Sequence, residues 1–370
     1  MKITRVEALH LRLPQVKEVA DGTQDCLLVR LYTDEGLTGL GEVVSCSYVA
    51  RAVVEAPRSA PFRHGLDAIL TGMDPFDLEA IEQALLHGTG WYGPGGVTRH
   101  ALSGVDMALW DLRGKAEGQP LRRLLNPEAA DRVPCYASAL WPERPEEVGE
   151  SAQDFAAQGY RAVKYGWGPM GKDAALDEEL VAAARQALGT GVDLMVDAGR
   201  AWDADTALER AGRFARYRIA WLEEPLHPYD YAGHGRLCAA SSVPIAGGEF
   251  LTLLEDYERL LGEGGIQIVQ PDLGRVGGIS WGQRLAGLAG RYRCRPVPHA
   301  YGTGVLLAAS AQWAAALEEP LTEYTSAPSP LARDLARHTL AFRGGELYLD
   351  DTPGLGVEID ESVVAQYRVN

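Results

Sequence analysis

The stretch VDLMVDAGRAWDADTALERAGRFARYRIAWLEEP (residues 192–225) contains one full copy of the pattern from which we predict the fold. A short apolar run over 192–199 is followed by an amphipathic helical pattern over 204–217 and then by a second apolar run. Short apolar runs joined by helices of this length are typical of parallel strands with helical crossovers. Each run carries an acidic residue near its end, Asp197 in the first and Glu223 in the second.

The same unit repeats from residue 133 onward. Amphipathic patterns of about 10 to 16 residues separate the apolar runs. The runs are VPCYASA (133–139), YRAVKYG (160–166), VDLMVDAG (192–199), IAWLEEP (219–225), VPIAGGE (243–249), GIQIVQPD (265–272), CRPVPHA (294–300) and PLTEYT (320–325). This order predicts a parallel (β/α)8-type barrel, a fold whose chemistry takes place at the C-terminal ends of its strands.

The first hundred residues follow another pattern, which predicts an α+β arrangement. Segments 1–13 and 25–43 alternate apolar and polar residues like antiparallel strands, with a turn at 34–36. Helical patterns then cover PFDLEAIEQALLH (75–87) and TRHALSGVDMALWDLRGKAEGQPLRRLL (98–125).

The bulk composition excludes several classes of function. The net charge of −16 over 370 residues argues against a nucleic acid or an anionic membrane surface as partner. No apolar run is long enough to span a membrane, and the N-terminus lacks the pattern of a signal peptide. The five cysteines are odd in number and form no CxxC pair, as expected of buried thiols in a reducing cytoplasm.

Ionisable residues stand at the ends of successive predicted strands. They are Lys164, Asp197, Glu223, Glu249, Asp272, His299 and Glu323. From Asp197 onward they recur every 23 to 27 residues, which is one strand–helix unit each time, so neighbours in the series belong to neighbouring strands. Five carboxylates at one mouth would repel one another unless a cation lies between them.

Three of these carboxylates, Asp197, Glu223 and Glu249, predict a metal site on adjacent strands. An all-oxygen set suits a hard divalent ion, and we expect Mg²⁺ because three carboxylates leave positions for water and substrate. Side chains alternate along a strand, so we expect Glu224 to point to the opposite side and either form a salt bridge or support the metal ligands from behind. The structural alternative is that each acid pairs with a surface arginine.

Asp272 and His299 follow on the next two strands. An aspartate that accepts one imidazole N–H fixes the tautomer and raises the basicity of the other nitrogen. His299 is therefore the expected base, and Asp272 orients it.

Taken together, these motifs resemble the enolase superfamily and, within it, the mandelate racemase-like group. The resemblance rests on MVDAG, LEEP, AGGE, QPDLGRVGG, VPHAYGTG and ALSGVDMALWDLRGK and covers nearly the whole chain. It implies an α+β capping domain (1–125), a modified (β/α)7β barrel (126–326) and a C-terminal segment that returns to the cap (327–370). It also implies self-association.

The chemistry that the resemblance implies is abstraction of a proton next to a carboxylate, giving an enediolate stabilised by one Mg²⁺ per active site. By family position, Lys164 lies near the same carboxylate and adds a fixed positive charge. Glu323 shares or donates a proton on the opposite side, which requires its pKa to be raised by neighbouring charge.

Gly166 distinguishes this chain from the racemase pattern, in which the second strand ends Lys-x-Lys and the second lysine is an acid/base. Here the motif is Lys164-Tyr165-Gly166, so the obvious partner of His299 is missing. A single base can remove the α-proton and then protonate a leaving hydroxyl. We therefore expect dehydration of an acid sugar to a 2-keto-3-deoxy acid.

Two alternatives stay open: a cycloisomerase, racemase or epimerase that uses the same enediolate, and a silent barrel that only binds a sugar acid. Gly166 could also be a bulge residue. Substrate identity is set in this family by two capping-domain loops, which are expected near 14–25 and 45–61. The expected substrate contacts are Tyr165, Trp167, Tyr48, Arg51 and Lys17.

Overall fold

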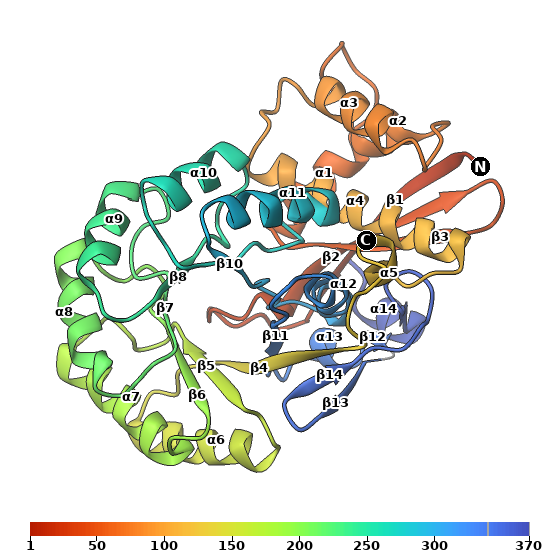
Figure 1. Cartoon of the computed structure of the whole chain (residues 1–370). Coiled ribbons are helices and arrows are strands. Elements are labelled where there is room, and N and C mark those ends of the chain that lie inside the picture. Colours follow the sequence, from red (N-terminus) through yellow and green to blue (C-terminus); the bar gives the residue numbers. More distant parts are fainter. Residues whose placement is uncertain (339, 370) are drawn as a thin grey trace.

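The computed structural model describes residues 1–338 and 340–369. Over residues 132–325 its strands form a parallel barrel wall in which each strand pairs with the next along the chain from β4 to β10, and β11 pairs with β4 (Figure 1). The strands are β4 (Arg132–Leu140), β5 (Ala162–Gly166), β6 (Asp193–Asp197), β7 (Leu222–Glu223), β8 (Ile245–Gly247), β9 (Ile268–Val269), β10 (Arg295–Pro296) and β11 (Thr322–Thr325).

One long helix follows each strand from β4 to β10. The helices are α6 (Pro145–Ala157), α7 (Ala174–Leu188), α8 (Ala204–Ala215), α9 (Tyr231–Ala240), α10 (Leu254–Gly262), α11 (Gly278–Arg291) and α12 (Gly304–Ala315). The predicted parallel barrel is confirmed, in the modified (β/α)7β form that the resemblance implied. Among the residues that the structure describes, no helix combines the length and the apolar character that a membrane crossing requires.

Strand alternation divides the apolar residues of the wall into two sets. Val163 and Tyr165 of β5 belong to the large core between the strands and the surrounding helices, whereas Ala162 belongs to a small cluster inside the barrel. Side chains two residues apart face the same way along a strand, so Lys164 and Gly166 share the inner face with Ala162. The sequence pattern of β5 thus directs its single cation inward.

The capping part begins with the antiparallel sheet β1 (Ile3–Arg12), β2 (Asp25–Thr33) and β3 (Thr38–Val43), as predicted. A short 3-10 turn, η1 (Gly22–Gln24), precedes β2, and the helices α1 (Ser47–Glu55), α2 (Leu66–Leu70) and α3 (Leu78–Gly88) follow. The long helix α4 (Val97–Glu117) packs on β3, where a side chain at Gly39 or Gly41 would collide with the α4 backbone.

The prediction of one helical pattern over 98–125 was wrong. Helix α4 ends at Glu117 and is capped by Gly118, which adopts a left-handed conformation with φ of 65°, and α5 (Leu121–Leu125) begins after Pro120. Glycine tolerates the left-handed conformation at a helix end, and proline cannot continue the hydrogen-bonding pattern. Gly118 and Pro120 therefore separate two helices that share one apolar periodicity.

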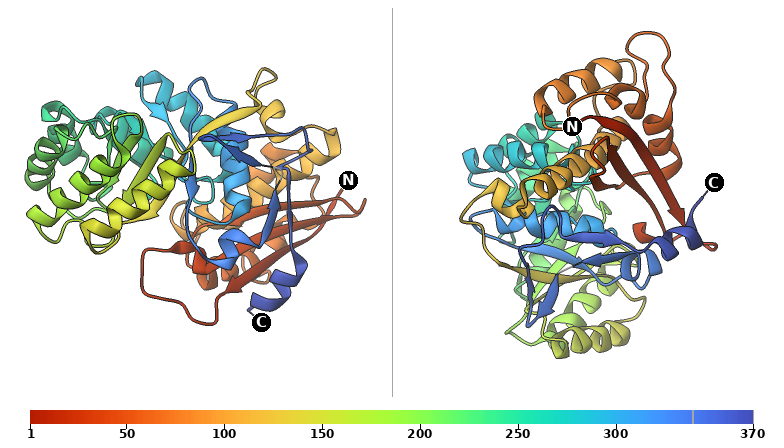
Figure 2. Two further views of the ribbon diagram at one scale, coloured as in Figure 1. Left: turned by 90° about the horizontal axis from the view of Figure 1, so that it is seen from below. Right: turned by 90° about the vertical axis from the view of Figure 1, so that its right-hand side faces the viewer.

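The C-terminal segment contacts both other parts. It contains α13 (Pro330–Arg333), β12 (Ala336–His338), β13 (Ala341–Arg343), β14 (Glu346–Tyr348), β15 (Val357–Ile359) and α14 (Glu361–Tyr367). Strand β14 pairs antiparallel with barrel strand β4, and Arg368 forms a bridge with Leu11 of β1. Figure 2 shows the N-terminal and C-terminal segments together on one side of the molecule, away from α7, α8 and α9.

Candidate active site

A cavity of about 240 Å³ lies at the C-terminal ends of the barrel strands. Its walls bring together five of the predicted strand-end residues: Lys164, Asp197, Glu249, His299 and Glu323. The other lining residues are Ala20, Gly22, Val44, Ser138, Ala139, Leu140, Gly166, Trp167, Phe250, Arg275 and Tyr301. Ala20, Gly22 and Val44 belong to the capping part, so cap and barrel enclose the cavity jointly.

Several of the predicted site residues stand just beyond their strands rather than on them. Strand β9 ends at Val269 and β10 at Pro296, which is earlier than the sequence predicted. Asp272 and His299 are nevertheless held in register by an isolated parallel bridge, in which the His299 amide donates to the Pro271 carbonyl at 3.1 Å. This bridge keeps Asp272 and His299 side by side, as the strand pattern predicted.

His299 is bound to Asp272 at one nitrogen and faces the carboxylates with the other. Its Nδ1 lies 2.7 Å from Oδ2 of Asp272, and its Nε2 lies 3.4 Å from Glu249 and 3.9 Å from Glu323. Burial alone would lower the pKa of His299, but Glu249, Glu323 and Asp272 outweigh it and raise the pKa to about 10. With Nδ1 committed to Asp272, Nε2 is the nitrogen available for proton transfer.

Lys164 lies between two carboxylates inside the barrel. Its ammonium forms ion pairs with Glu223 and, at 3.0 Å, with Oε1 of Glu323. Burial opposes the charge, but the two glutamates hold the Lys164 pKa well above its ordinary value. The ammonium is therefore a fixed positive charge at this wall of the cavity.

The expectation of a raised pKa at Glu323 was wrong. Burial does raise it, but Lys164 and His299 have the larger combined effect and bring the pKa to about 2. The Ala300 amide adds a hydrogen bond of 2.6 Å to its Oε2. Glu323 in this arrangement is an ionised acceptor.

Glu223 is turned away from the cavity. One of its carboxylate oxygens pairs with Lys164, and the other accepts hydrogen bonds from Trp221 at 2.9 Å and Gln270 at 2.6 Å. Within residues 1–338 and 340–369, no three histidine, cysteine or carboxylate side chains gather closely enough to hold a metal ion. A metal site with Glu223 as third ligand requires its carboxylate to leave Lys164.

Glu224 does not point to the opposite side, contrary to the prediction. Its φ of 40° breaks the strand alternation and leaves the carboxylate near Glu249 and Asp197, with Arg200 Nε 3.9 Å away. Burial first, and then the charges of Glu249 and Asp197, raise its pKa well above the ordinary value. Its Oε2 is buried without a hydrogen-bond partner among the described residues.

These buried acids are suited to a divalent cation in charge and donor type. Burial and neighbouring carboxylates also raise the pKa values of Asp197 and Glu249, so ionising the group without added positive charge is costly. Carboxylate oxygens are the donors that Mg²⁺ prefers, and the orphaned oxygen of Glu224 adds an acceptor. The donor set fits such an ion once Glu223 or Glu224 turns toward Asp197 and Glu249.

Of the five predicted substrate contacts, Trp167 alone lines the cavity. Tyr165 was wrongly predicted: it alternates with Lys164, so its ring stacks on Trp141 and its hydroxyl lies 2.9 Å from Ser151 on the helical side of the wall. Lys17, Tyr48 and Arg51 do not belong to the lining residues. Tyr48 packs its ring edge on His10, and Arg51 pairs with Glu55 on α1.

Sequence reasoning missed Arg275 and Ser138 on this cavity. Arg275 lies in the QPDLGRVGG segment, three residues after Asp272, and its guanidinium sits 4.7 Å from the ring centroid of Phe250. Ser138 lies two residues before the end of β4, the first barrel strand, which has no ionisable group at its end. An extension of the strand-end search to all polar residues would have found Ser138.

Glu42 of the cap fixes the segment that follows His299. Its carboxylate accepts hydrogen bonds from the Thr303 amide at 3.0 Å, the Thr303 hydroxyl at 2.5 Å and the Leu306 amide at 2.9 Å. These groups lie at the start of α12, where backbone N–H groups lack helical partners. The capping sheet thereby holds the loop that carries His299.

Comparison with known proteins matches two family models to most of the chain. One, described as the mandelate racemase / muconate lactonizing enzyme N-terminal domain, matches residues 3–126. The other, described as enolase C-terminal domain-like, matches residues 147–363.

Relatives with named activities cover nearly the full length. The D-galactarolactone cycloisomerase of Agrobacterium fabrum (strain C58) is 32% identical, over 100% of this chain and 99% of the relative. The D-galactonate dehydratase of Pectobacterium atrosepticum is also 32% identical, over 93% and 91% of the two chains. The crystal structure of the 3,6-anhydro-D-galactonate cycloisomerase from Zobellia galactanivorans covers 100% of both chains with a TM-score of 0.91 and 28% identity. Hydro-lyases and cycloisomerases are thus both similar to this chain.

Proposed function

We propose that this chain, which belongs to the mandelate racemase / muconate lactonizing enzyme family of the enolase superfamily, is a Mg²⁺-dependent dehydratase of acid sugars. Its full-length relatives are enzymes, either dehydratases or cycloisomerases. The proposed substrate is an aldonic or aldaric acid, and the proposed product is the corresponding 2-keto-3-deoxy acid.

The observation that carries the proposal is the geometry at Gly166. A Cβ atom built at this position would lie 2.5 Å from Oδ2 and 2.8 Å from Cβ of Asp197. Strand β5 pairs with β6 without a register shift and places Gly166 directly beside Asp197, so a bulge does not explain the glycine. A second acid/base on this strand would therefore displace one of the proposed metal ligands.

His299 is then the one residue proposed to move a proton. In its neutral form it takes, at Nε2, the proton from the carbon next to the substrate carboxylate, and Asp272 stabilises the imidazolium that forms. The same nitrogen returns the proton to the hydroxyl on the adjacent carbon as that carbon–oxygen bond breaks. Water leaves, and the resulting enol becomes the 2-keto-3-deoxy acid.

Lys164 and Glu323 are proposed to act by charge and hydrogen bonding. The Lys164 ammonium, paired with two glutamates, supplies positive charge where the substrate carboxylate gains negative charge. Ionised Glu323 lies 3.9 Å from Nε2 of His299 and favours the protonated imidazole. Neither role requires these residues to exchange a proton with the substrate.

The proposed ligands of Mg²⁺ are Asp197, Glu223 and Glu249. Members of the enolase superfamily are generally Mg²⁺-dependent, and the buried carboxylates favour a counter-charge at this place. Bound there, the ion would act as a Lewis acid for the negative charge that develops on the substrate carboxylate.

Cycloisomerisation is the second proposal, since two of the similar proteins described above carry that activity. It uses the same first proton transfer but retains every atom of the substrate. The two activities are therefore separated by the mass of the product.

The test is incubation of the purified protein with Mg²⁺ and a panel of aldonic acids, aldaric acids and aldarolactones, with products read by mass spectrometry. Dehydration gives a product that is lighter by one water and reacts as a 2-keto acid. A product of unchanged mass from a lactone would replace dehydration by cycloisomerisation. No conversion and no exchange of the α-proton across the panel would contradict both activities.

We also propose the division into a cap (1–125), a barrel (126–326) and a returning segment (327–370). Self-association and a cytoplasmic location stay predictions.

A further inference from the structure

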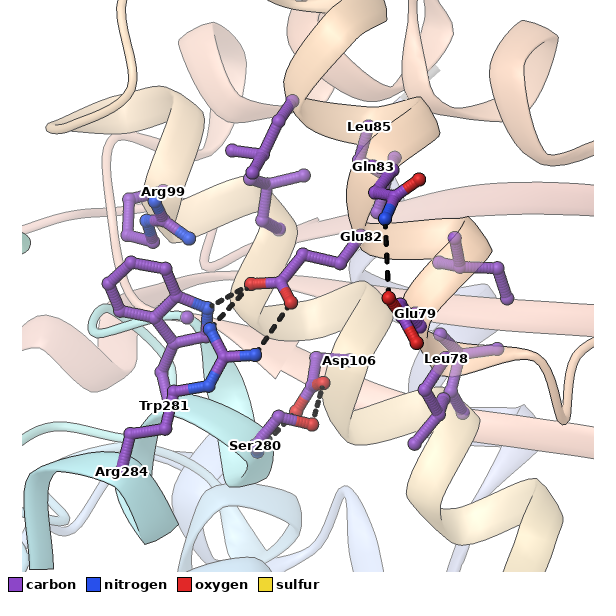
Figure 3. A pocket seen from close by; sticks show the side chains of 15 residues that line it. Leu78, Glu79, Glu82, Gln83, Leu85, Arg99, Asp106, Ser280, Trp281 and Arg284 are labelled. Carbon is purple, nitrogen blue, oxygen red and sulfur yellow. Dashed lines mark hydrogen bonds and ion pairs between the residues drawn. The ribbon is translucent and has the colours of Figure 1, made fainter. Parts of the chain in front are cut away.

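A second, larger cavity of about 540 Å³ lies where the cap meets the barrel (Figure 3). Cap helices α3 and α4 form one side, and the start of barrel helix α11 forms the other. Its lining residues include apolar side chains of α3 and α4 together with Glu82, Arg99, Asp106, Trp281 and Arg284. None of them lines the active-site cavity, so the two cavities are separate.

Arg99 is the unusual group in this wall. Arg99 is only 3% exposed, and its Nε is buried without a hydrogen-bond partner among the described residues. Among the described residues its guanidinium makes no hydrogen bond or ion pair and stacks on Trp281, 3.6 Å from a ring centroid. Burial lowers its pKa to about 10, so the group is still charged at neutral pH. A buried charge without a hydrogen-bonding partner is costly.

The other charged groups of the cavity already have partners. Arg284 holds Glu82 through two hydrogen bonds, of 2.7 and 2.6 Å, and Trp281 adds a third of 3.0 Å to the same carboxylate (Figure 3). Asp106 accepts from the Ser280 hydroxyl at 2.5 Å and from the Ser280 amide at 2.9 Å. Of the two arginines that line this cavity, Arg99 is thus the one without an ion pair or hydrogen bond to a carboxylate among the described residues.

The rest of the wall is largely hydrocarbon. It is formed by Leu78, Ile81, Leu85, Leu102 and Leu109, which come from α3 and α4. Such a wall offers no hydrogen bonds to the hydroxyl groups of a sugar, which would lose their hydration on entry. A multiply charged anion would also be repelled by Glu82 and Asp106. The wall favours an apolar body with one negative charge.

We propose that this cavity binds a monocarboxylic acid with an apolar body, with the carboxylate on Arg99 and the hydrocarbon along the leucines of α3 and α4. The volume lies within the range of small-molecule sites, which are mostly apolar with a few placed polar groups. The carboxylate supplies the hydrogen bonds that Arg99 lacks, in the two-pronged geometry that guanidinium favours. The ligand would touch both cap and barrel.

The test is isothermal titration calorimetry of the full-length protein with octanoate, with 1-octanol and propionate as comparison ligands. Octanoate is expected to bind at least tenfold more tightly than either, because octanol lacks the charge and propionate lacks the apolar body. Equal binding of octanoate and octanol, or no binding of octanoate, would overturn the proposal without any variant.

Two variants locate the site. Arg99→Met keeps an unbranched hydrocarbon side chain against Trp281 but removes the positive charge. It is expected to weaken octanoate binding at least tenfold. The matched control is Arg113→Met in the same helix. Arg113 pairs with Glu117 and does not line the cavity. Leu78→Trp places a larger side chain in the apolar end of the cavity, at a position that is half-buried in the native protein. It should also weaken octanoate binding at least tenfold, although Arg99 is intact.

Circular dichroism establishes that each variant is folded before titration. Should Arg99→Met fail to fold, Leu78→Trp decides whether octanoate occupies this cavity. Unchanged octanoate affinity in either folded variant would place the binding elsewhere and overturn the proposal.

Discussion

A side chain at position 166 would bring its first carbon to 2.5 Å from Oδ2 of Asp197. Strands β5 and β6 pair at these two residues, so neither backbone can shift without disturbing the barrel wall. In the racemase-type pattern this position carries a second lysine, and here the neighbouring carboxylate occupies the room that its first carbon would need. The glycine removes one acid/base and at the same time fixes the place of a proposed metal ligand.

Substitution Gly166→Ala is therefore expected to lower kcat/KM for the acid-sugar substrate by at least tenfold, because Asp197 must move to admit the methyl group. The matched control is Gly149→Ala in helix α6, where an added Cβ meets nothing within 4 Å. Alanine in a helix interior is favoured over glycine by about 0.5–1 kcal/mol, so the control should be fully active. Equal activity of both variants would contradict the contact with Asp197.

His299→Asn should lower dehydration by about 10²- to 10⁴-fold, the usual contribution of a positioned general base. Exchange of the substrate α-proton with D2O should fall in parallel, because the same nitrogen carries out that step. His87→Asn on the exposed side of α3 is the control. Exchange that continued at the native rate in His299→Asn would assign the proton transfer to another group.

The two adjacent glutamates allow the metal site to be tested directly. Glu223→Gln is expected to weaken Mg²⁺ binding by at least tenfold, measured by calorimetry without substrate. Glu224→Gln should have a smaller effect, since Glu224 has Arg200 as its partner and is not a proposed ligand. The opposite order would make Glu224 the third ligand and leave Glu223 with Lys164, the pairing seen in the structure.

Asp106 makes a pH-dependent contribution to stability. Burial raises its pKa from 3.8 to about 6, although hydrogen bonds from Ser280 act in the opposite direction. A carboxyl group whose pKa is higher in the folded state binds its proton more tightly there, so the free energy of unfolding falls as pH rises through this range. Above the pKa that Asp106 has in the folded state, the free energy of unfolding has fallen by its full amount, about 3 kcal/mol.

Asp106→Asn removes this titration and can keep hydrogen bonds to Ser280. Relative to the native protein, its free energy of unfolding should rise by roughly 2 to 3 kcal/mol between about pH 4 and pH 7. Urea unfolding at several pH values measures the difference, and Asp205→Asn at an exposed position is the control. A difference that does not change with pH would contradict the raised pKa.

Periodicity predicted the barrel because each strand needs two apolar faces and each helix one. The inward direction of Lys164 and Gly166 follows from the same alternation, which also shows why Tyr165 faces the helices. Glu224 could not be placed in this way, since its positive φ breaks the alternation at the strand end. The division at Gly118 was missed because an apolar period can continue across a break in the backbone.

Side-chain pairing was the part that spacing could not supply. The sequence placed Lys164, Glu223 and Glu323 around one mouth, but the ion pairs among them depend on which way each carboxylate turns. The low pKa of Glu323 follows from those ion pairs and from His299. Arg99 and its cavity lay outside the strand-end pattern altogether, because helices of the cap and the barrel form them.

The central claim is that one base, His299, acts on one face of the substrate. The most direct test is to stop the reaction in D2O before completion and to determine by NMR the configuration at the α-carbon of the remaining substrate. We predict that the recovered substrate keeps its original configuration, with or without deuterium, beside a product lighter by one water. Recovery of the epimer would show a second acid/base on the opposite face and contradict the one-base account.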